Sequence, residues 1–301
     1  MEIRDDSMVP CALCNQWRLA SDIRGMEPVA FFLTEVPQSV TSRPSRAAGA
    51  RVLLSCLSIA LGSLALGGAA HAAGAVTAAE PVAWVGQFAR DRDAWREVRL
   101  KPDLAPNDFG YRDWDGVQAL EVRSASSMSL MARPLDVDLE ATPVLCWRWR
   151  VASSIAGADM RQREGDDYAA RVYVSFSLPE ATMSFGLKAK LTLARAFWGA
   201  DLPDAAVNYV WDNRNPQGTE QANAYTDRAM MVVLRSGDAD AGGWVWERRN
   251  VKADVSRLFA PGARALQLAV TADTDNTGTS AHAGFADFHF VREGSRCRAP
   301  S

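Results

Sequence analysis

Short segments in which apolar and polar residues alternate fill the chain after residue 81, and this pattern constrains the fold more than any other feature. A period of two residues is typical of strands with one buried face. Ten such segments without regular helices between them favour antiparallel pairing. We therefore predict an all-β protein, an antiparallel β-sandwich of jelly-roll or galactose-binding-like type. The predicted strands are Val82–Phe88, Trp95–Leu100, Gly116–Arg123, Met128–Ala132, Val144–Ala152, Tyr168–Leu178, Ala206–Trp211, Ala229–Arg235, Ala265–Ala272 and Ala283–Val291.

One or two short helices interrupt this pattern. In Leu187–Phe197, the apolar residues recur at the spacing of one helix face. A shorter helix is predicted at Val251–Phe259.

Alternation also assigns side chains to faces. In Val144–Val151, Trp147 and Trp149 share the apolar side, and Arg148 lies on the opposite one. In Tyr168–Leu178, Arg171 and Tyr173 oppose an apolar side. If the two strands share a sheet, its non-core face carries arginines, a tyrosine and serines, and is either a concave binding surface or the solvated outside of a sandwich.

The stretch Ala272–Val291 combines a polar loop with a closing strand. Strict alternation in this strand predicts Phe285, Asp287 and His289 on one face, and Gly284, Ala286, Phe288 and Phe290 on the other.

The loop itself resembles the start of a calcium site, because Asp273, Asp275 and Asn276 offer closely spaced oxygen ligands before the turn at Gly278. It departs from an EF-hand, because the twelfth position counted from Asp273 is Gly284, where an EF-hand has a glutamate that binds calcium through both oxygens. A non-EF calcium site of Asp273, Asp275 and Asp287 is one prediction, and an Asx-rich turn is the other. No other cofactor is expected.

The N-terminal part carries the three regions of a secretory signal. Arginines at 43, 46 and 51 precede the apolar run Val52–Leu66, and Ala70-His71-Ala72 fits a peptidase site. The run has about 15 residues, whereas a membrane span needs about 20. We predict a signal peptide at 43–72, cleaved after Ala72, a periplasmic or secreted bacterial protein, and no stable membrane anchor.

These boundaries divide the chain into five parts. Residues 1–42 are predicted to be a non-native or disordered extension and residues 73–80 a linker. A single β-sandwich domain is expected at 81–293 and a disordered tail at 294–301. In the mature chain, Cys146 and Cys297 either form a disulfide or leave Cys146 as a buried thiol.

Charge and motif content exclude several classes. A net charge of −3 gives no general field for nucleic acid. Three histidines without a zinc pattern, and the absence of a G-x-S-x-G or phosphate-binding glycine motif, exclude the familiar hydrolase and nucleotide enzymes. The sequence does not indicate an oligomeric state.

Six ordered segments resemble a known family. They are Arg133–Leu139, Val144–Arg150, Gly165–Val174, Asn208–Trp211, Tyr225–Met231 and Thr271–Thr279. Together they resemble the bacterial family of exported proteins catalogued as domain of unknown function 3047. This resemblance implies an exported, single-domain β-sandwich and carries no activity.

The favoured functional hypothesis is non-catalytic binding of a saccharide or another polar ligand of the cell envelope. One alternative is a glycan-active enzyme, a lyase or hydrolase, in which Tyr173 or an aspartate is the acid or base and an arginine stabilises the anion. The other is a structural envelope component. Trp211 is considered an exposed platform for a sugar ring. The candidate ligand-binding residues are Arg148, Asp166, Asp167, Arg171, Tyr173, Trp211, Asp227, Arg228, Asp273, Asp275 and Asn276.

Overall fold

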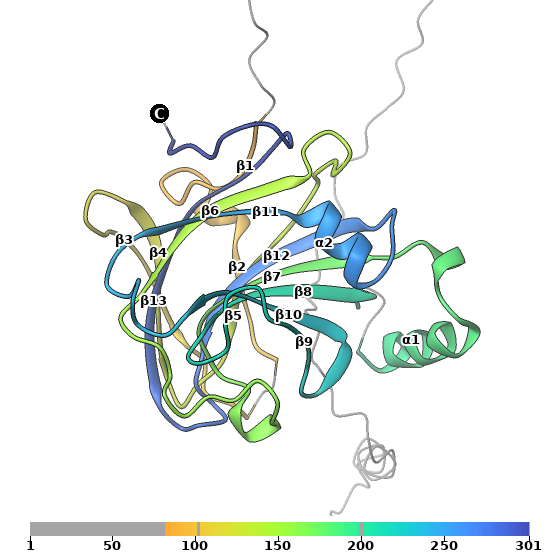
Figure 1. Ribbon diagram of the computed structural model, residues 1–301, viewed down its shortest axis with the longest axis horizontal. Coiled ribbons are helices and arrows are strands. Elements are labelled where there is room, and N and C mark those ends of the chain that lie inside the picture. The colour runs from red at the N-terminus through yellow and green to blue at the C-terminus, as the bar shows by residue number, and fades with distance from the viewer. Residues whose placement is uncertain (1–81, 101–102, 199–201, 301) are drawn as a thin grey trace, which may run out of the picture. The chain divides into compact units, whose positions relative to one another are not determined.

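The computed structural model describes residues 82–100, 103–198 and 202–300, which all belong to one compact unit (Figure 1). The predicted extension, signal peptide and linker lie outside the described residues. Within the described ranges, no helix has the length and apolar character needed to cross a membrane.

Two β-sheets form the framework, as predicted for an all-β sandwich. Sheet A has the order β11 (Val245–Asn250), β6 (Val144–Val151), β13 (Ser280–Val291), β4 (Gln118–Ala125) and β3 (Asp108–Asp113), and β1 (Val82–Gly86) also pairs with β13. Sheet B has the order β2 (Arg96–Val98), β5 (Leu130–Pro134), β12 (Arg264–Asp273), β7 (Tyr168–Ser177), β8 (Ala205–Asp212), β10 (Thr226–Ser236) and β9 (Glu220–Asn223).

Strand pairing departs from the prediction at one place. The pairing is antiparallel throughout the described strands except between β8 and β10, which run parallel. The chain passes from β8 to β9, at the outer edge of β10, before it returns through β10 itself. Figure 1 shows β12, β7, β8 and β10 side by side in this order.

The hydrophobic core lies between the two sheets. Trp147 of β6 packs against Tyr209 of β8, with ring centroids 5.5 Å apart, and Trp149 packs against Trp211, at 5.7 Å. All four rings are fully buried. The predicted apolar sides of β6 and β7 both face this core, so the face assignments within each strand are confirmed.

The assumption that β6 and β7 share a sheet is wrong, because β6 belongs to sheet A and β7 to sheet B. Their polar faces therefore point away from each other, on opposite outsides of the sandwich. Arg148 and Arg171 cannot contribute to one surface.

All ten predicted strands are present, and three further strands were not predicted: β3, β9 and β11. All three lie at sheet edges. An edge strand buries less of its surface, so its sequence shows weaker alternation, and β9 is only four residues long.

A β-bulge at Asp287 changes the expected faces of β13. Asp287 has a φ of 59°, and the register with β6 shifts between Ala286 and His289. Phe285 therefore faces the core together with Phe288, and the predicted alternation is wrong before the bulge.

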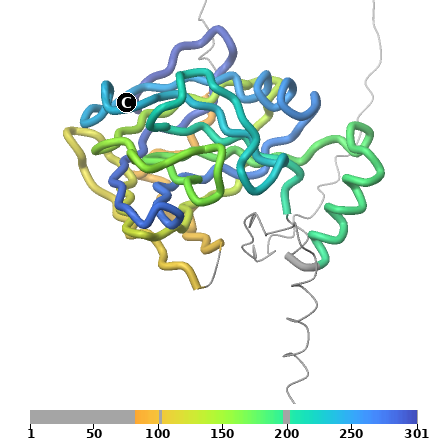
Figure 2. Tube along the Cα trace, turned by 60° about the horizontal axis from the view of Figure 1, so that its bottom comes forward, coloured from red at the N-terminus to blue at the C-terminus, as the bar shows by residue number. Residues whose placement is uncertain are grey.

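The two predicted helices are α1 (Phe185–Trp198) and α2 (Val251–Leu258). The side chain of Asn250 caps α2 by accepting a hydrogen bond from the backbone N–H of Ala253, 2.9 Å away. Figures 1 and 2 both show α1 set beside the sheets, between β7 and β8 in the chain. Short 3-10 turns occur at Arg92–Ala94, Arg163–Gly165 and Glu180–Thr182.

A disulfide joins Cys146 in β6 to Cys297 near the C-terminus. The sequence left this pairing open and predicted a disordered tail. The bond ties Cys297, in the segment after β13, to sheet A.

His289 holds the same segment by a second contact. Its buried ring has Nδ1 2.7 Å from the carbonyl oxygen of Asp287 and Nε2 3.2 Å from the backbone nitrogen of Arg298. The neutral ring with hydrogen on Nδ1 satisfies both contacts. Burial lowers the pKa of His289, and the nearby Arg298 acts in the same direction, although the Asp287 carbonyl opposes them.

We expect the Cys297→Ala variant to lose about 3–5 kcal/mol of unfolding free energy, because the cross-link constrains a long loop of the unfolded chain. Urea denaturation with and without reductant measures this. The reduced wild type serves as the control and should show a similar loss. A midpoint that reductant leaves unchanged would contradict the stabilising role of the bond.

We also expect acid to weaken the domain through His289. Its stabilising contribution is complete above the usual histidine pKa of about 6.5 and is lost as the pH falls toward the lower pKa of the folded state. Urea denaturation across this range, on the wild type and on His289→Gln, tests this. The variant should show a flatter pH dependence, and an equal slope in both proteins would count against the role of His289.

Candidate functional site on the outer face of sheet B

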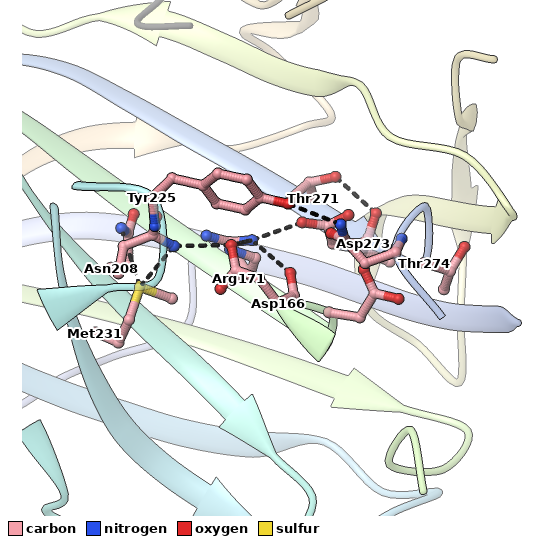
Figure 3. A network of polar contacts seen from close by, with 12 residues as sticks. Asp166, Arg171, Asn208, Tyr225, Met231, Thr271, Asp273 and Thr274 are labelled. Carbon is pink, nitrogen blue, oxygen red and sulfur yellow. Dashed lines mark hydrogen bonds and ion pairs between the residues drawn. The ribbon is translucent and has the colours of Figure 1, made fainter. Parts of the chain in front are cut away.

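Polar side chains gather on the outer face of sheet B, defined here as the face that points away from sheet A. Arg171 of β7 lies at the centre, between Asp166, which precedes β7, and Asp273, which ends β12 (Figure 3). β7 pairs with β12 on one side and with β8 on the other. Three strands therefore bring these groups together.

Arg171 is almost fully buried, and its guanidinium NH1 lies 2.5 Å from Asp273 Oδ2 and 3.7 Å from Asp166 Oδ2. The guanidinium also stacks over the rings of Tyr168 and Tyr173, at 4.7 and 4.9 Å from their centroids. Burial alone would lower the pKa of Arg171, but Tyr173, Asp166 and Asp273 outweigh burial and raise it. Arg171 therefore stays charged.

The carboxylates outnumber this single buried cation. Burial raises the pKa of Asp273 well above its usual value, and nearby Asp275 and Asp167 raise it further, against the opposing effect of Arg171. Burial likewise raises the pKa of Asp166, despite Arg171. A raised pKa favours the neutral form of a carboxyl group, so Arg171 does not fully offset the cost of burying these carboxylates.

Asp167 organises the loop between β12 and β13. Its Oδ1 accepts the N–H of Asn276 at 3.2 Å, and its Oδ2 accepts the N–H and hydroxyl of Thr277, at 2.7 and 2.6 Å. The Asn276 amide donates in turn to the Tyr225 hydroxyl, 2.9 Å away. The loop is therefore held by a carboxylate from outside it, whereas the predicted Asx-rich turn would use the loop's own Asp and Asn side chains.

The segment before β7 is positioned by a close backbone approach at Gly165. The N–H of Asp159 donates to the Gly165 carbonyl at 2.8 Å, and a Cβ at Gly165 would lie 2.7 Å from the Asp159 nitrogen. A larger residue would push Asp166 and Asp167 out of place.

On the other side of Arg171, two asparagines extend the network. Asn223 at the end of β9 donates to Asp166 Oδ2 at 2.7 Å, and Asn208 of β8 donates to the sulfur of Met231 at 3.4 Å. All four side chains are nearly or fully buried. Figure 3 shows Asn208 beside Met231.

Besides Tyr168 Oη and one oxygen each of Asp166 and Asp273, three buried polar atoms of this face have no hydrogen-bond partner within the described part of the chain: Arg171 Nε, Asn208 Oδ1 and Ser175 Oγ. They supply a donor, an acceptor and a hydroxyl. Asn208 lies opposite Tyr173 in the pairing of β7 with β8, so it stands between Arg171 and Ser175. Buried polar atoms are normally satisfied by protein, water or ligand.

Apolar side chains flank this polar row. On the β5 side, Tyr173 packs with Leu130 and Leu104. On the β10 side, Met160 packs with Val210 and Met231. The face thus combines a polar centre with apolar margins.

Seven of the predicted site residues come together here. Direct contacts link Arg171 with Asp166, Asp273 and Tyr173, and the adjoining loop holds the remaining members of the set. The seven are Asp166, Asp167, Arg171, Tyr173, Asp273, Asp275 and Asn276.

Three predicted residues lie elsewhere on sheet B. Trp211 is a core residue whose Nε1 donates to the Gly237 carbonyl, so its proposed role as an exposed platform is wrong. Asp227 is exposed. Arg228 donates to the carbonyl of Asp204, 2.9 Å away, and stacks on Phe259.

Arg148 belongs to the outer face of sheet A, where its Nε pairs with Asp287. Its guanidinium also lies over the rings of Trp246 and Trp244, at 5.2 and 5.9 Å. Asp287 therefore cannot complete a metal site with Asp273 and Asp275, and that part of the calcium prediction is wrong.

Sequence reasoning missed Asn208, Asn223 and Ser175 as site residues. The available signal was a polar residue within an otherwise apolar strand, as in Ala205–Trp211, where Asn208 is the one amide. Asn208 and Tyr225 also begin two of the segments that carry the family resemblance, and both segments reach the network.

The residues that could hold a metal ion are Asp167, Asp273 and Asp275, whose ligand oxygens all lie within 4.8 Å of one another. Carboxylate oxygens suit calcium. However, Arg171 already contacts Asp273, and Asp167 already accepts three hydrogen bonds. Asp167 Oδ1 accepts one hydrogen bond and Asp273 Oδ1 accepts none from the described residues, so both oxygens keep a lone pair and calcium stays a prediction, with Asp167 in the place of Asp287.

Comparisons with known proteins give a family, and they show a weak structural likeness to solved structures. The model of a family described as "Protein of unknown function (DUF3047)" matches residues 93–289, more than half of the 301 residues. Among solved structures, the chain is similar to the xyloglucanase domain of NopAA, a type three effector from Sinorhizobium fredii, in complex with cellobiose. Identity is 9%, and the match covers 65% of this chain and 92% of that chain. The TM-score is 0.34, which is too low to support a conclusion about fold or function. No curated protein matches.

If the three carboxylates bind calcium, the ion should stabilise the folded protein by about 2.7 kcal/mol at a hundred times its dissociation constant. Thermal denaturation in calcium and in chelator measures this. Asp275→Asn should abolish the increase, whereas the control Asp287→Asn should keep it. Equal melting temperatures with and without calcium would exclude the site.

Proposed function

We propose that the chain, which belongs to the DUF3047 family as its six segments predicted, binds a saccharide or a similar polar ligand on the outer face of sheet B. It binds this ligand without catalysing a reaction on it. The family itself supplies no activity. The proposal rests on the residues of this face.

The observation that carries the proposal is the row formed by Arg171 Nε, Asn208 Oδ1 and Ser175 Oγ, three buried atoms without partners in the described chain. Leaving a buried polar group unpaired costs about 1–3 kcal/mol. A ligand with hydroxyl groups would satisfy all three, because a hydroxyl both donates and accepts.

The dimensions of the row support a ligand of more than a few atoms. Arg171 and Ser175 are four residues apart on one strand, which corresponds to about 13 Å. The row is therefore long enough for several hydroxyl groups in sequence.

The apolar margins support a saccharide in particular. A sugar ring presents hydroxyls at its edge and C–H groups on its faces. Binding sites for such ligands combine mostly apolar walls with a few placed polar groups. Tyr173 and Met160, on the two sides of the row, belong to such walls.

Electrostatics favour binding over catalysis. Burial raises the pKa of Tyr173, although Arg171 opposes it, so the phenol stays protonated at neutral pH and does not supply a base. Asp166 and Asp273 are engaged with Arg171. The glycan-active enzyme is therefore the second hypothesis.

The disulfide between Cys146 and Cys297 supports export, because such bonds persist in oxidising compartments. We accordingly propose a periplasmic or secreted protein whose ligand belongs to the cell envelope.

The Ser175→Ala variant provides the sharpest test. Removing an unpaired buried hydroxyl should leave the unfolding free energy of the ligand-free protein nearly unchanged. Saccharide affinity should fall by about five-fold, the equivalent of one hydrogen bond of about 1 kcal/mol. A glycan array identifies the ligand, and calorimetry compares the affinities.

The matched control is Ser236→Ala, at the far end of β10, which should bind like the wild type. Product analysis on the same glycans separates binding from turnover. A protein that binds no glycan, or a Ser175→Ala variant with wild-type affinity and reduced stability, would leave this row as a structural element only.

A further inference from the structure

A second region with the properties of a site lies where the C-terminal segment passes β1 and the end of β13. There a pocket of about 390 Å³ is lined by Val82, Val291, Gly294, Ser295, Arg296 and Arg298. Its residues belong to sheet A and the segment beyond it, so the pocket shares no residue with the face of sheet B described above.

The charge of this lining is positive. Arg296 and Arg298 make no ion pair with any described residue, and none of the described residues that line the pocket is acidic. Several other arginines of the domain differ in this respect: Arg148 and Arg150 on the same sheet, for example, both pair with aspartates. Two unpaired guanidinium groups at one pocket attract an anion.

Ser295 supplies an independent observation. The residue is 6% exposed, and its Oγ is buried without a hydrogen-bond partner among the described residues. Its backbone is fixed, because its N–H donates to the Arg292 carbonyl at 3.1 Å and its carbonyl accepts from Arg248 at 3.4 Å. A hydroxyl held in this way is a ready donor to a ligand oxygen.

Two contacts fix the backbone beside the pocket at Cys297 and Arg298. Cys297, between the two arginines, is bonded to Cys146, and the N–H of Arg298 donates to His289 Nε2. The two guanidinium groups therefore start from a constrained backbone, which lowers the entropy lost on binding.

We propose that this pocket binds an oxyanion, a phosphate group, with Arg296 and Arg298 supplying the charge and Ser295 Oγ a hydrogen bond. The phosphate comes either from free inorganic phosphate or from the headgroup of an anionic lipid. Both sources present the same oxygens, and the binding weakens with salt.

The test uses the full chain with its disulfide intact. Calorimetric titration with inorganic phosphate at low ionic strength measures the free anion. Cosedimentation with phosphatidylcholine vesicles, with and without phosphatidic acid, measures the headgroup. Arg296→Gln/Arg298→Gln should weaken binding by about ten-fold or more, and Ser295→Ala by about five-fold. Arg264→Gln, an exposed arginine at the start of β12, is the control for charge.

Each outcome decides the proposal. Phosphate binding that the double variant loses and Arg264→Gln keeps supports the free anion. Binding only to vesicles with phosphatidic acid, with the same dependence, supports the headgroup. Absence of binding in both assays, or equal weakening by the control, overturns the site. Circular dichroism and urea denaturation of every variant exclude loss of the fold as the cause.

Discussion

The buried ion pair between Arg171 and Asp273 is the interaction on which the candidate site depends. Removing two charges from water is costly, and their attraction offsets this cost only when the geometry is good and other groups assist. Here Asp166 and two tyrosine rings assist Arg171. Loss of Arg171 would leave several carboxylates uncompensated, so this residue couples the charge of the site to the folding of sheet B.

The alternating pattern predicted the architecture because a residue period of two specifies which side of a strand is buried. It located ten strands and the core-facing residues Trp147 and Trp149. It could not assign strands to sheets, because a pattern within one strand carries no information about its neighbours. Arg148 was therefore grouped with Arg171, although the sandwich places them on opposite outsides. The bulge at Asp287 was not predicted for a similar reason. One inserted residue exchanges the two faces of a strand, and the amino-acid sequence does not indicate where this happens.

The site was predicted in part, for a physical reason. Carboxylates and arginines are readily chosen as site candidates from a sequence, because they are rarely buried without a partner. Asp166, Arg171 and Asp273 were found in this way. Serine and asparagine are ordinary surface residues in most proteins, and what distinguishes Ser175 and Asn208 is their burial with an unpaired oxygen each. Trp211 shows the opposite error. Its polar neighbours in the sequence suggested an exposed side chain, although the side chain lies in the core.

The disulfide also determines the order in which the protein can be synthesised and cross-linked. It joins residues separated by 151 positions, and its second cysteine follows β13 in the chain. The bond therefore cannot form until the final strand and the segment beyond it have left the ribosome and reached an oxidant. A chain truncated after β13 would therefore lack this cross-link however well its sheets had paired.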